Sequence, residues 1–135
     1  MKQPLQLCLN SHDEVFLIDL DLVLYFQSDD HYTHVYYTLG SHFILPYGLG
    51  RIEALLAELG PEAAFMIRMG RKLIINSHRI YRVNTMKEQL YLVDDKGSNV
   101  VLHIPKNVLR NWVDDLNSRD FTKKNGVLTF SVSTN

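Results

Sequence analysis

Hydrophobic and polar positions along the chain alternate with a period close to two residues. In a β-strand successive side chains point to opposite faces, so this period indicates strands rather than helices. Short stretches rich in Gly, Asn, Asp and Ser, such as NSHD at 10–13 and DDKGSN at 94–99, separate the apolar runs and favour turns. The pattern predicts strands near residues 4–9, 14–19, 21–27, 33–38, 41–45, 65–69, 73–76, 79–86, 89–93 and 99–104.

Two segments have the three-and-four spacing of an amphipathic helix instead. In GRIEALLAELG, at 50–60, Gly60 stands where a C-terminal cap belongs and Pro61 cannot continue the helix. In PKNVLRNWVDDL, at 105–116, Pro105 suits a first helical turn. The apolar stripe of this second helix, which we assign to the core, is Val108, Leu109, Trp112 and Leu116. The sequence therefore predicts a mainly β fold, with antiparallel strands in small sheets and two short α-helices.

The length and composition fit one domain with an appended segment. The chain has 135 residues, of which 46% are hydrophobic, enough to bury a single core. We expect a domain over residues 1–116 and a C-terminal extension at 117–135. The extension becomes apolar again at GVLTFSVS, residues 126–133, which predicts an added strand. That strand either offers an edge to a second copy of the chain or completes a sheet of its own domain.

The charge is nearly balanced overall but is segregated along the sequence. With 14 Lys and Arg against 15 Asp and Glu, the net charge of −1 does not predict nucleic-acid binding. However, residues 1–62 carry two basic and nine acidic groups, residues 63–87 carry six basic groups and no acid, and residues 88–135 carry six of each. Charge concentrated on one face steers partners whatever its sum. The basic stretch is therefore either a strand face paired with the acidic half or a surface for a polyanion.

The sequence contains few of the features that indicate a metal site, a cofactor site or an active site. His31 and His34 lie three apart in a predicted strand, so they point to opposite sides and do not easily share an ion. A single cysteine excludes a thiolate zinc pattern, and no H-E-x-x-H, G-x-G-x-x-G or Walker motif is present. Ser77 beside His78 lacks a nucleophile elbow. We expect no metal, no cofactor and no enzymatic activity.

The sequence also favours a cytoplasmic location. Cys8 has no partner for an intrachain disulfide, which fits a reducing compartment. The first residues meet Asp13 and Glu14 early, unlike a secretion signal, and no apolar run approaches the roughly 20 residues that a membrane span needs. We therefore expect no membrane partner.

Three loop tips carry the residues that suit DNA. Arg71 and Lys72 follow Gly70 between two predicted strands, so they sit at or beside a turn. Arg and Lys supply contacts to phosphates, and an Arg fork also fits the O6 and N7 acceptors of guanine. The other two tips are HIPKNV, where Lys106 and Asn107 open the second helix, and SDDHYTH, with His31, Thr33 and His34.

Taken in order, these segments resemble the LytTR family of bacterial DNA-binding domains. The resemblance is carried by LIDLDLVLYFQSDDHYTHVYYTLG (17–40), RIEALLAEL (51–59), FMIRMGRKLIINSHRI (65–80) and VVLHIPKNVL (100–109), and it covers roughly residues 4–116. It implies an antiparallel β fold that inserts loops into successive grooves of double-stranded DNA, usually to regulate transcription. Relatives tend to occupy paired direct repeats, which implies self-association on DNA. Most relatives also carry a receiver domain, which this chain has no room for.

The resemblance also implies roles for single residues. It assigns Arg71 to a base or groove contact and Lys72 to phosphate, with Lys106, assisted by Asn107, as the second contact. Gly70, Lys72, Pro105 and Lys106 depart from the usual His, Ser, Ser and Arg of the family while keeping a basic tip.

Three further candidates carry more than one interpretation. Thr33 and His34 fall where the family has its first contacting loop, although His34 is equally compatible with a half-buried strand position. Arg68 lies on a strand, where it either braces its neighbours or touches DNA. The leading hypothesis is a free-standing, sequence-specific DNA-binding transcriptional regulator. The alternative is a β-rich protein-interaction module of the same family that no longer binds DNA, because the acids before residue 63 repel phosphate if they share the face of the tips.

Overall fold

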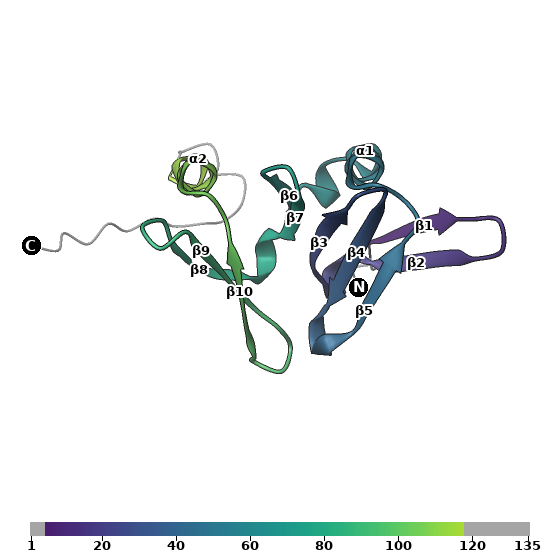
Figure 1. Ribbon diagram of the computed structural model, residues 1–135, viewed down its shortest axis with the longest axis horizontal. Coiled ribbons are helices and arrows are strands. Elements are labelled where there is room, and N and C mark those ends of the chain that lie inside the picture. The colour runs from purple at the N-terminus through teal and green to yellow at the C-terminus, as the bar shows by residue number, and fades with distance from the viewer. Residues whose placement is uncertain (1–4, 118–135) are drawn as a thin grey trace, which may run out of the picture.

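The computed structural model describes residues 5–117, which form ten strands in three antiparallel sheets together with two α-helices (Figure 1). The strands are β1 (Gln6–Asn10), β2 (Val15–Asp19), β3 (Val23–Asp29), β4 (Tyr32–Tyr37), β5 (His42–Leu45), β6 (Met66–Met69), β7 (Leu73–Asn76), β8 (Ile80–Asn84), β9 (Gln89–Val93) and β10 (Asn99–His103). The helices are α1 (Leu49–Leu59) and α2 (Lys106–Leu116). The predicted fold class is confirmed, and each predicted strand is present with ends within two residues of its expected bounds. The added strand predicted at 126–133 lies outside the described residues.

The three sheets have simple orders. The largest has five strands in the order β5-β4-β3-β7-β6, the next has β10-β9-β8, and β1 pairs with β2 alone. Because β3 pairs with both β4 and β7, the hairpins β3–β4 and β6–β7 are joined into one sheet. Their turns therefore lie at the same end of the sheet, where the Ser28 N–H donates to the Lys72 carbonyl at 2.8 Å.

Two hydrophobic cores lie on either side of the five-stranded sheet. One contains Phe26 and Val35 of the sheet, Ile18 of β2, and Ile52 of α1. The other contains Ile75 of β7, Leu90 and Leu92 of β9, and Leu109 of α2, with Trp112 half-buried against it as predicted. In Figure 1, α1 and the β1–β2 pair accordingly lie at one side of the molecule, and α2 with the three-stranded sheet at the other.

Asn76 turns the chain from the first half of the molecule into the second. Its buried side-chain amide donates to the Val23 carbonyl at 2.9 Å, and its side-chain oxygen accepts from the His78 N–H at 2.9 Å. That second bond caps the short 3-10 helix Ser77–Arg79, which leads into β8. Asn76 thus serves both a turn and a long-range backbone hydrogen bond.

Candidate nucleic-acid interface

The β6–β7 turn presents two cations to solvent. Gly70 has φ of +74°, a left-handed conformation that glycine adopts without strain, so the chain reverses sharply after Met69. Arg71 and Lys72 follow, and both are exposed. Neither side chain makes an ion pair with another described residue. The bond from Ser28 to the Lys72 carbonyl holds the turn against the end of β3. The turn is therefore a supported basic tip.

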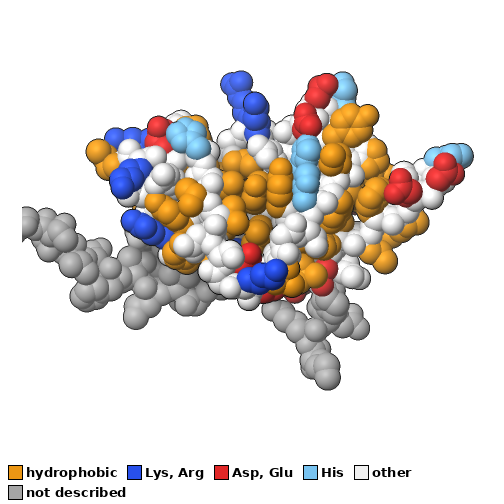
Figure 2. Space-filling view, turned by 60° about the horizontal axis from the view of Figure 1, so that its bottom comes forward, with side chains coloured by type: hydrophobic (Ala, Val, Ile, Leu, Met, Phe, Trp, Pro, Cys, Tyr) orange, Lys and Arg blue, Asp and Glu red, His pale blue; other side chains and the backbone are white. Residues whose placement is uncertain are grey.

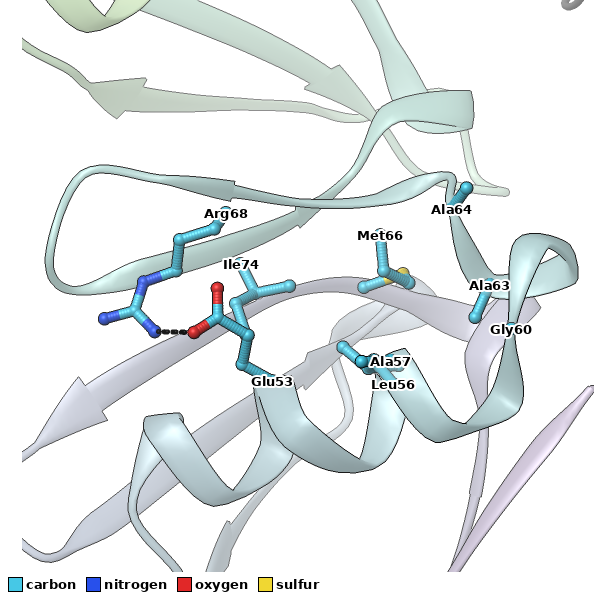
Figure 3. A pocket seen from close by; sticks show the side chains of 9 residues that line it. All are labelled: Glu53, Leu56, Ala57, Gly60, Ala63, Ala64, Met66, Arg68 and Ile74. Atoms are coloured by element: carbon cyan, nitrogen blue, oxygen red, sulfur yellow. Dashed lines mark hydrogen bonds and ion pairs between the residues drawn. The ribbon is translucent and has the colours of Figure 1, made fainter.

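Arg68 braces this tip from the preceding strand. Its Nε donates to the Gly70 carbonyl at 3.0 Å, and its Nη2 donates to the Arg71 carbonyl at 2.6 Å. Its Nη1 pairs with Glu53 of α1 at 3.2 Å, across a pocket of about 300 Å³ lined by Ala57, Ala63, Met66 and others (Figure 3). Of the two sequence interpretations of Arg68, these contacts favour bracing, because each of its three nitrogens already has an acceptor.

A groove brings two of the predicted tips together. It has a volume of about 500 Å³, and Arg71 and Lys72 line it together with Asn107 at the start of α2. We call it the tip groove. Lys106 does not line it, but its neighbours Pro105 and Asn107 do. The N–H of Lys106 donates to Glu88 Oε2 at 2.7 Å, which fixes the beginning of α2. The groove thus brings together two adjacent cations, Arg71 and Lys72, and the amide of Asn107, which follows them by more than thirty residues in the chain.

Two further polar residues of the tip groove were not among the predicted contacts. Gln27 comes from β3, and His103 is the last residue of β10. Both offer hydrogen-bonding groups next to the cations. His103 directly precedes the IPKN segment that begins the second helix, and this adjacency is the one signal in the sequence that marks it.

The structure contradicts the prediction that Thr33 contacts DNA. It is fully buried, and its hydroxyl donates to the Tyr47 carbonyl at 2.8 Å. Thr33 also shares its face of β4 with Val35, which is fully buried in the core. Because a side chain without exposed surface does not reach a nucleic acid, we exclude Thr33 from the interface.

His34 lies on the opposite face of β4 and belongs to a chain of hydrogen bonds. Its Nε2 is 2.8 Å from Asp29 Oδ2, and its Nδ1 is 2.8 Å from His42 Nε2. Its side chain is 19% exposed. Both ring nitrogens are therefore engaged, and a contact with DNA requires that one of these bonds be given up. The half-buried strand position is the better description of His34.

Aromatic rings continue the face on which His34 lies. The Tyr36 ring stacks on Tyr25 with centroids 4.4 Å apart and on His42 at the same distance. Burial raises the pKa of the Tyr25 hydroxyl to about 12, and the neighbouring Tyr36 adds to the rise. Tyr25 therefore loses its proton only at strongly alkaline pH, and the stacked rings form a continuous aromatic surface on this face of the sheet.

The acids of the N-terminal half are divided between the far end of the molecule and the surroundings of the basic tip, where Glu53 pairs with Arg68. Asp13 and Glu14 occupy the β1–β2 turn, which Figure 1 places at the opposite end of the molecule from α2. Figure 2 shows acidic side chains at one extremity of the face, and others beside the basic side chains near its middle and toward the other end. Asp29 and Asp30, by contrast, adjoin the tip through Ser28. Each has a histidine nearby, His34 at 2.8 Å and His31 at 3.7 Å, respectively.

Within residues 5–117, no group of three or more His, Cys, Asp or Glu side chains is placed to hold a metal ion. None of the helices described there has the length and hydrophobicity that crossing a membrane requires.

Comparison with known proteins agrees with the family resemblance of the sequence motifs. A family model described as the LytTr DNA-binding domain matches residues 13–113. Among solved structures, the chain resembles the LytTr DNA-binding domain of a methyl-accepting/DNA response regulator from Bacillus cereus, with a TM-score of 0.57 and 19% sequence identity. That similarity covers 87% of this chain and 100% of the other. Compared with curated proteins, the chain gives no match.

Proposed function

The chain belongs to the LytTr family of DNA-binding domains, and from this premise we propose that it is a transcriptional regulator that recognises particular DNA sequences by inserting loops into the grooves. The observation that supports this proposal best is the tip groove, where Arg71 and Lys72 from one loop meet Asn107 from the start of α2. Their neighbour Lys106 lies at the border of the same groove. We propose these four residues as the contacts, with Arg68 as the residue that positions the β6–β7 turn.

The chemistry of the groove suits duplex DNA. The Arg71 guanidinium is able to donate two parallel hydrogen bonds to guanine O6 and N7, an interaction worth about 1–3 kcal/mol of discrimination against another base. Lys72 supplies a point charge for phosphate, which contributes affinity without sequence preference. Asn107 has both a donor and an acceptor for a base edge or a backbone oxygen.

Apart from the first turn of α2, which carries Lys106 and Asn107, the helices are less suited to enter a groove than the β6–β7 turn is. The exposed face of α1 carries Glu53 and Glu58 against Arg51, and beyond its first turn α2 carries Asp114 and Asp115 against Arg110. Carboxylates placed against the phosphate backbone are repelled by it. Loop insertion therefore agrees better with the distribution of charge than a recognition helix does.

A titration at several salt concentrations tests DNA binding itself. A fluorescent pool of mixed duplexes is titrated with the full chain, and we expect the logarithm of the association constant to fall linearly with the logarithm of salt, by about 0.9 per phosphate neutralised. If no duplex binds even at low salt, the protein-interaction module becomes the better function.

Variants at the tip test the assignment of the contacts. Arg71→Ala is expected to relax the preference at particular base pairs, while Lys72→Ala weakens all duplexes alike and lowers the salt slope by about 1. The matched control is Lys96→Ala, because Lys96 is exposed in the β9–β10 turn, at the other end of β10 from Lys106. Equal binding by all three variants and the parent, with unchanged melting curves, refutes the site.

We also propose that two molecules of the protein bind side by side on repeated DNA sites. Titration of duplexes that contain either one or two repeats of a selected site measures whether the two molecules bind cooperatively. Stronger binding of the second copy supports cooperation, and independent binding at every spacing of the two sites contradicts it.

A further inference from the structure

A second groove of about 500 Å³ lies on the underside of α2, away from the residues proposed to contact DNA. Phe65, Ile67, Ile80, Val83, Trp112 and Leu116 contribute most of its apolar wall. We call it the α2 groove. Its lining comes from β6 and the two residues before it, from Ser77 and His78 of the short 3-10 helix, from β8, and from the last two turns of α2. It is therefore bounded by elements of both larger sheets.

The strands beside the α2 groove are outer strands. β6 ends the order of the five-stranded sheet, and β8 ends that of the three-stranded sheet. Within the described part of the chain, no strand pairs with the outer edge of β8. An outer strand offers unpaired N–H and C=O groups to an added strand. An apolar groove that runs along such an edge suits an extended segment with apolar side chains on one face.

This chain contains a segment with that pattern. In VLTFSV, residues 127–132, Leu128, Phe130 and Val132 alternate with Thr129 and Ser131. As a strand, the segment places the three large apolar side chains on one face and the hydroxyls on the other. The apolar face of such a strand would suit the α2 groove, and its hydroxyl face would point away from the groove.

The path of the chain brings this segment within reach. Leu116 lines the α2 groove and Asn117 directly follows α2, so the chain leaves the helix at the rim of the groove. The eleven residue-to-residue steps from Asn117 to Leu128 span at most about 40 Å when extended. The five residues of β8 extend over only about 17 Å. The chain is therefore long enough to turn back after α2 and run along β8.

We propose that residues 127–132 dock in the α2 groove of their own chain as a strand along β8, with Leu128 and Phe130 beside Trp112. Docking in this way covers apolar surface of α2 and ties the helix to β8. Because α2 begins at Lys106, beside the tip groove, the segment also helps to hold one wall of that groove in place. The proposal itself does not depend on DNA binding.

Trp112 reports directly on docking, since it is the only tryptophan of the chain and lines the α2 groove. The experiment uses the full chain and compares it with Phe130→Asp and Leu128→Asp, with Thr129→Asp as the matched control. We expect the parent and the Thr129 variant to share a blue-shifted emission and weak quenching by acrylamide. In the Phe130 and Leu128 variants, the emission shifts to the red and quenching rises severalfold. Phe130→Ser serves in place of Phe130→Asp if the charge prevents folding, as judged by circular dichroism.

Each outcome decides the proposal. Equal quenching in all the folded proteins shows that the segment does not cover Trp112 and overturns the proposal. An equal effect of all three Asp substitutions overturns the strand geometry. If the protection of Trp112 in the parent is lost on dilution while sedimentation shows a dimer dissociating, the groove is filled by a second copy and the intrachain proposal fails. Protection that is independent of concentration and lost only in the Leu128 and Phe130 variants supports it.

Discussion

Arg68 shows how much the role of one cation depends on its acceptors. Its guanidinium joins the Gly70 and Arg71 carbonyls to Glu53, so it organises the β6–β7 turn from within. Arginine is suited to this role because its planar fork presents several donors in fixed directions. Lysine carries the same charge but is a single point donor. The identity of the residue, and not only its charge, therefore matters at this position.

We predict that Arg68→Lys loosens the tip although the charge is kept. The variant loses at least one of the carbonyl contacts, which costs roughly 1–2 kcal/mol of unfolding free energy, and amide exchange at residues 70–72 becomes faster. DNA affinity falls with an unchanged salt slope, because the number of cations on phosphate is the same. A reduced slope in Arg68→Met but not in Arg68→Lys identifies Arg68 as a phosphate contact instead and contradicts the brace.

Thr33 leads to the opposite prediction, a loss of stability without a loss of recognition. Thr33→Val keeps the shape of the buried side chain but leaves the part-buried Tyr47 carbonyl without its donor. We expect the free energy of unfolding to fall by about 1–3 kcal/mol, measured by urea denaturation. DNA affinity is expected to be unchanged at a temperature where both proteins are folded. A change in base preference in this variant contradicts the exclusion of Thr33 from the interface.

At the scale of elements, β3, β4 and β5 hold a ladder of stacked rings on one sheet face. Tyr25, Tyr36, His42 and His34 come from neighbouring strands in register, with the pairs Tyr25–Tyr36 and Tyr36–His42 directly opposite each other. Directly opposite positions bring side chains into contact, which explains the short distances between the rings. One consequence is the raised pKa of the half-buried Tyr25.

This raised pKa predicts a loss of stability at alkaline pH. Below pH 10, Tyr25 is neutral in the folded and the unfolded chain and makes no difference. Between pH 10 and about 12, the unfolded chain loses the Tyr25 proton first, so unfolding becomes more favourable as the pH rises.

Tyr25→Phe removes this contribution. We therefore expect the stability of the parent to fall relative to that of the variant between pH 10 and 12, measured as urea midpoints. Burial also raises the pKa of Tyr37, so part of the alkaline loss remains in Tyr25→Phe. The control is Tyr81→Phe, because the Tyr81 ring is half-exposed on β8. Parallel curves for the parent and Tyr25→Phe over this range contradict the assignment.

At the scale of the whole molecule, a polar clamp joins the two cores. Arg79 pairs with Asp95 of the β9–β10 turn and donates to the Asp21 carbonyl at 2.6 Å. The Asp95 N–H in turn donates to Thr38 Oγ1 at 2.6 Å. The Arg79 side chain is only 18% exposed, so its charge depends on these partners. The clamp fixes the three-stranded sheet, and hence α2, against the half that carries β3.

Arg79→Met is therefore expected to loosen one half of the molecule more than the other. The loss of these contacts costs about 1–3 kcal/mol, and native-state hydrogen exchange is expected to accelerate most in β8, β9 and β10. Because Arg71 and Asn107 lie on opposite sides of this junction, DNA affinity falls as well. Lys87→Met, which removes an exposed cation of the β8–β9 turn that makes no ion pair with a described residue, is the control. Equal acceleration in β3 and β4 shows that the clamp does not act between the halves.

The strands, both helices and the basic turn follow from local features of the sequence. A period of two residues marks the strands, Gly60 and Pro61 end α1, and Gly70 permits the turn that exposes Arg71 and Lys72. These features depend on neighbouring residues, so no knowledge of the rest of the chain is needed to find them. The same holds for the family resemblance, whose motifs are contiguous segments.

Only the tertiary structure decided which of these residues share a surface. Alternation along β4 separates Thr33 from His34, but contacts with Tyr47, Asp29 and His42 determine that the first is buried and the second engaged. Likewise, the meeting of Arg71 with Asn107 depends on how the two halves pack around β7 and α2. The physical reason is that a strand pattern defines two faces without stating what covers each one. That assignment arises from contacts between residues far apart in the chain.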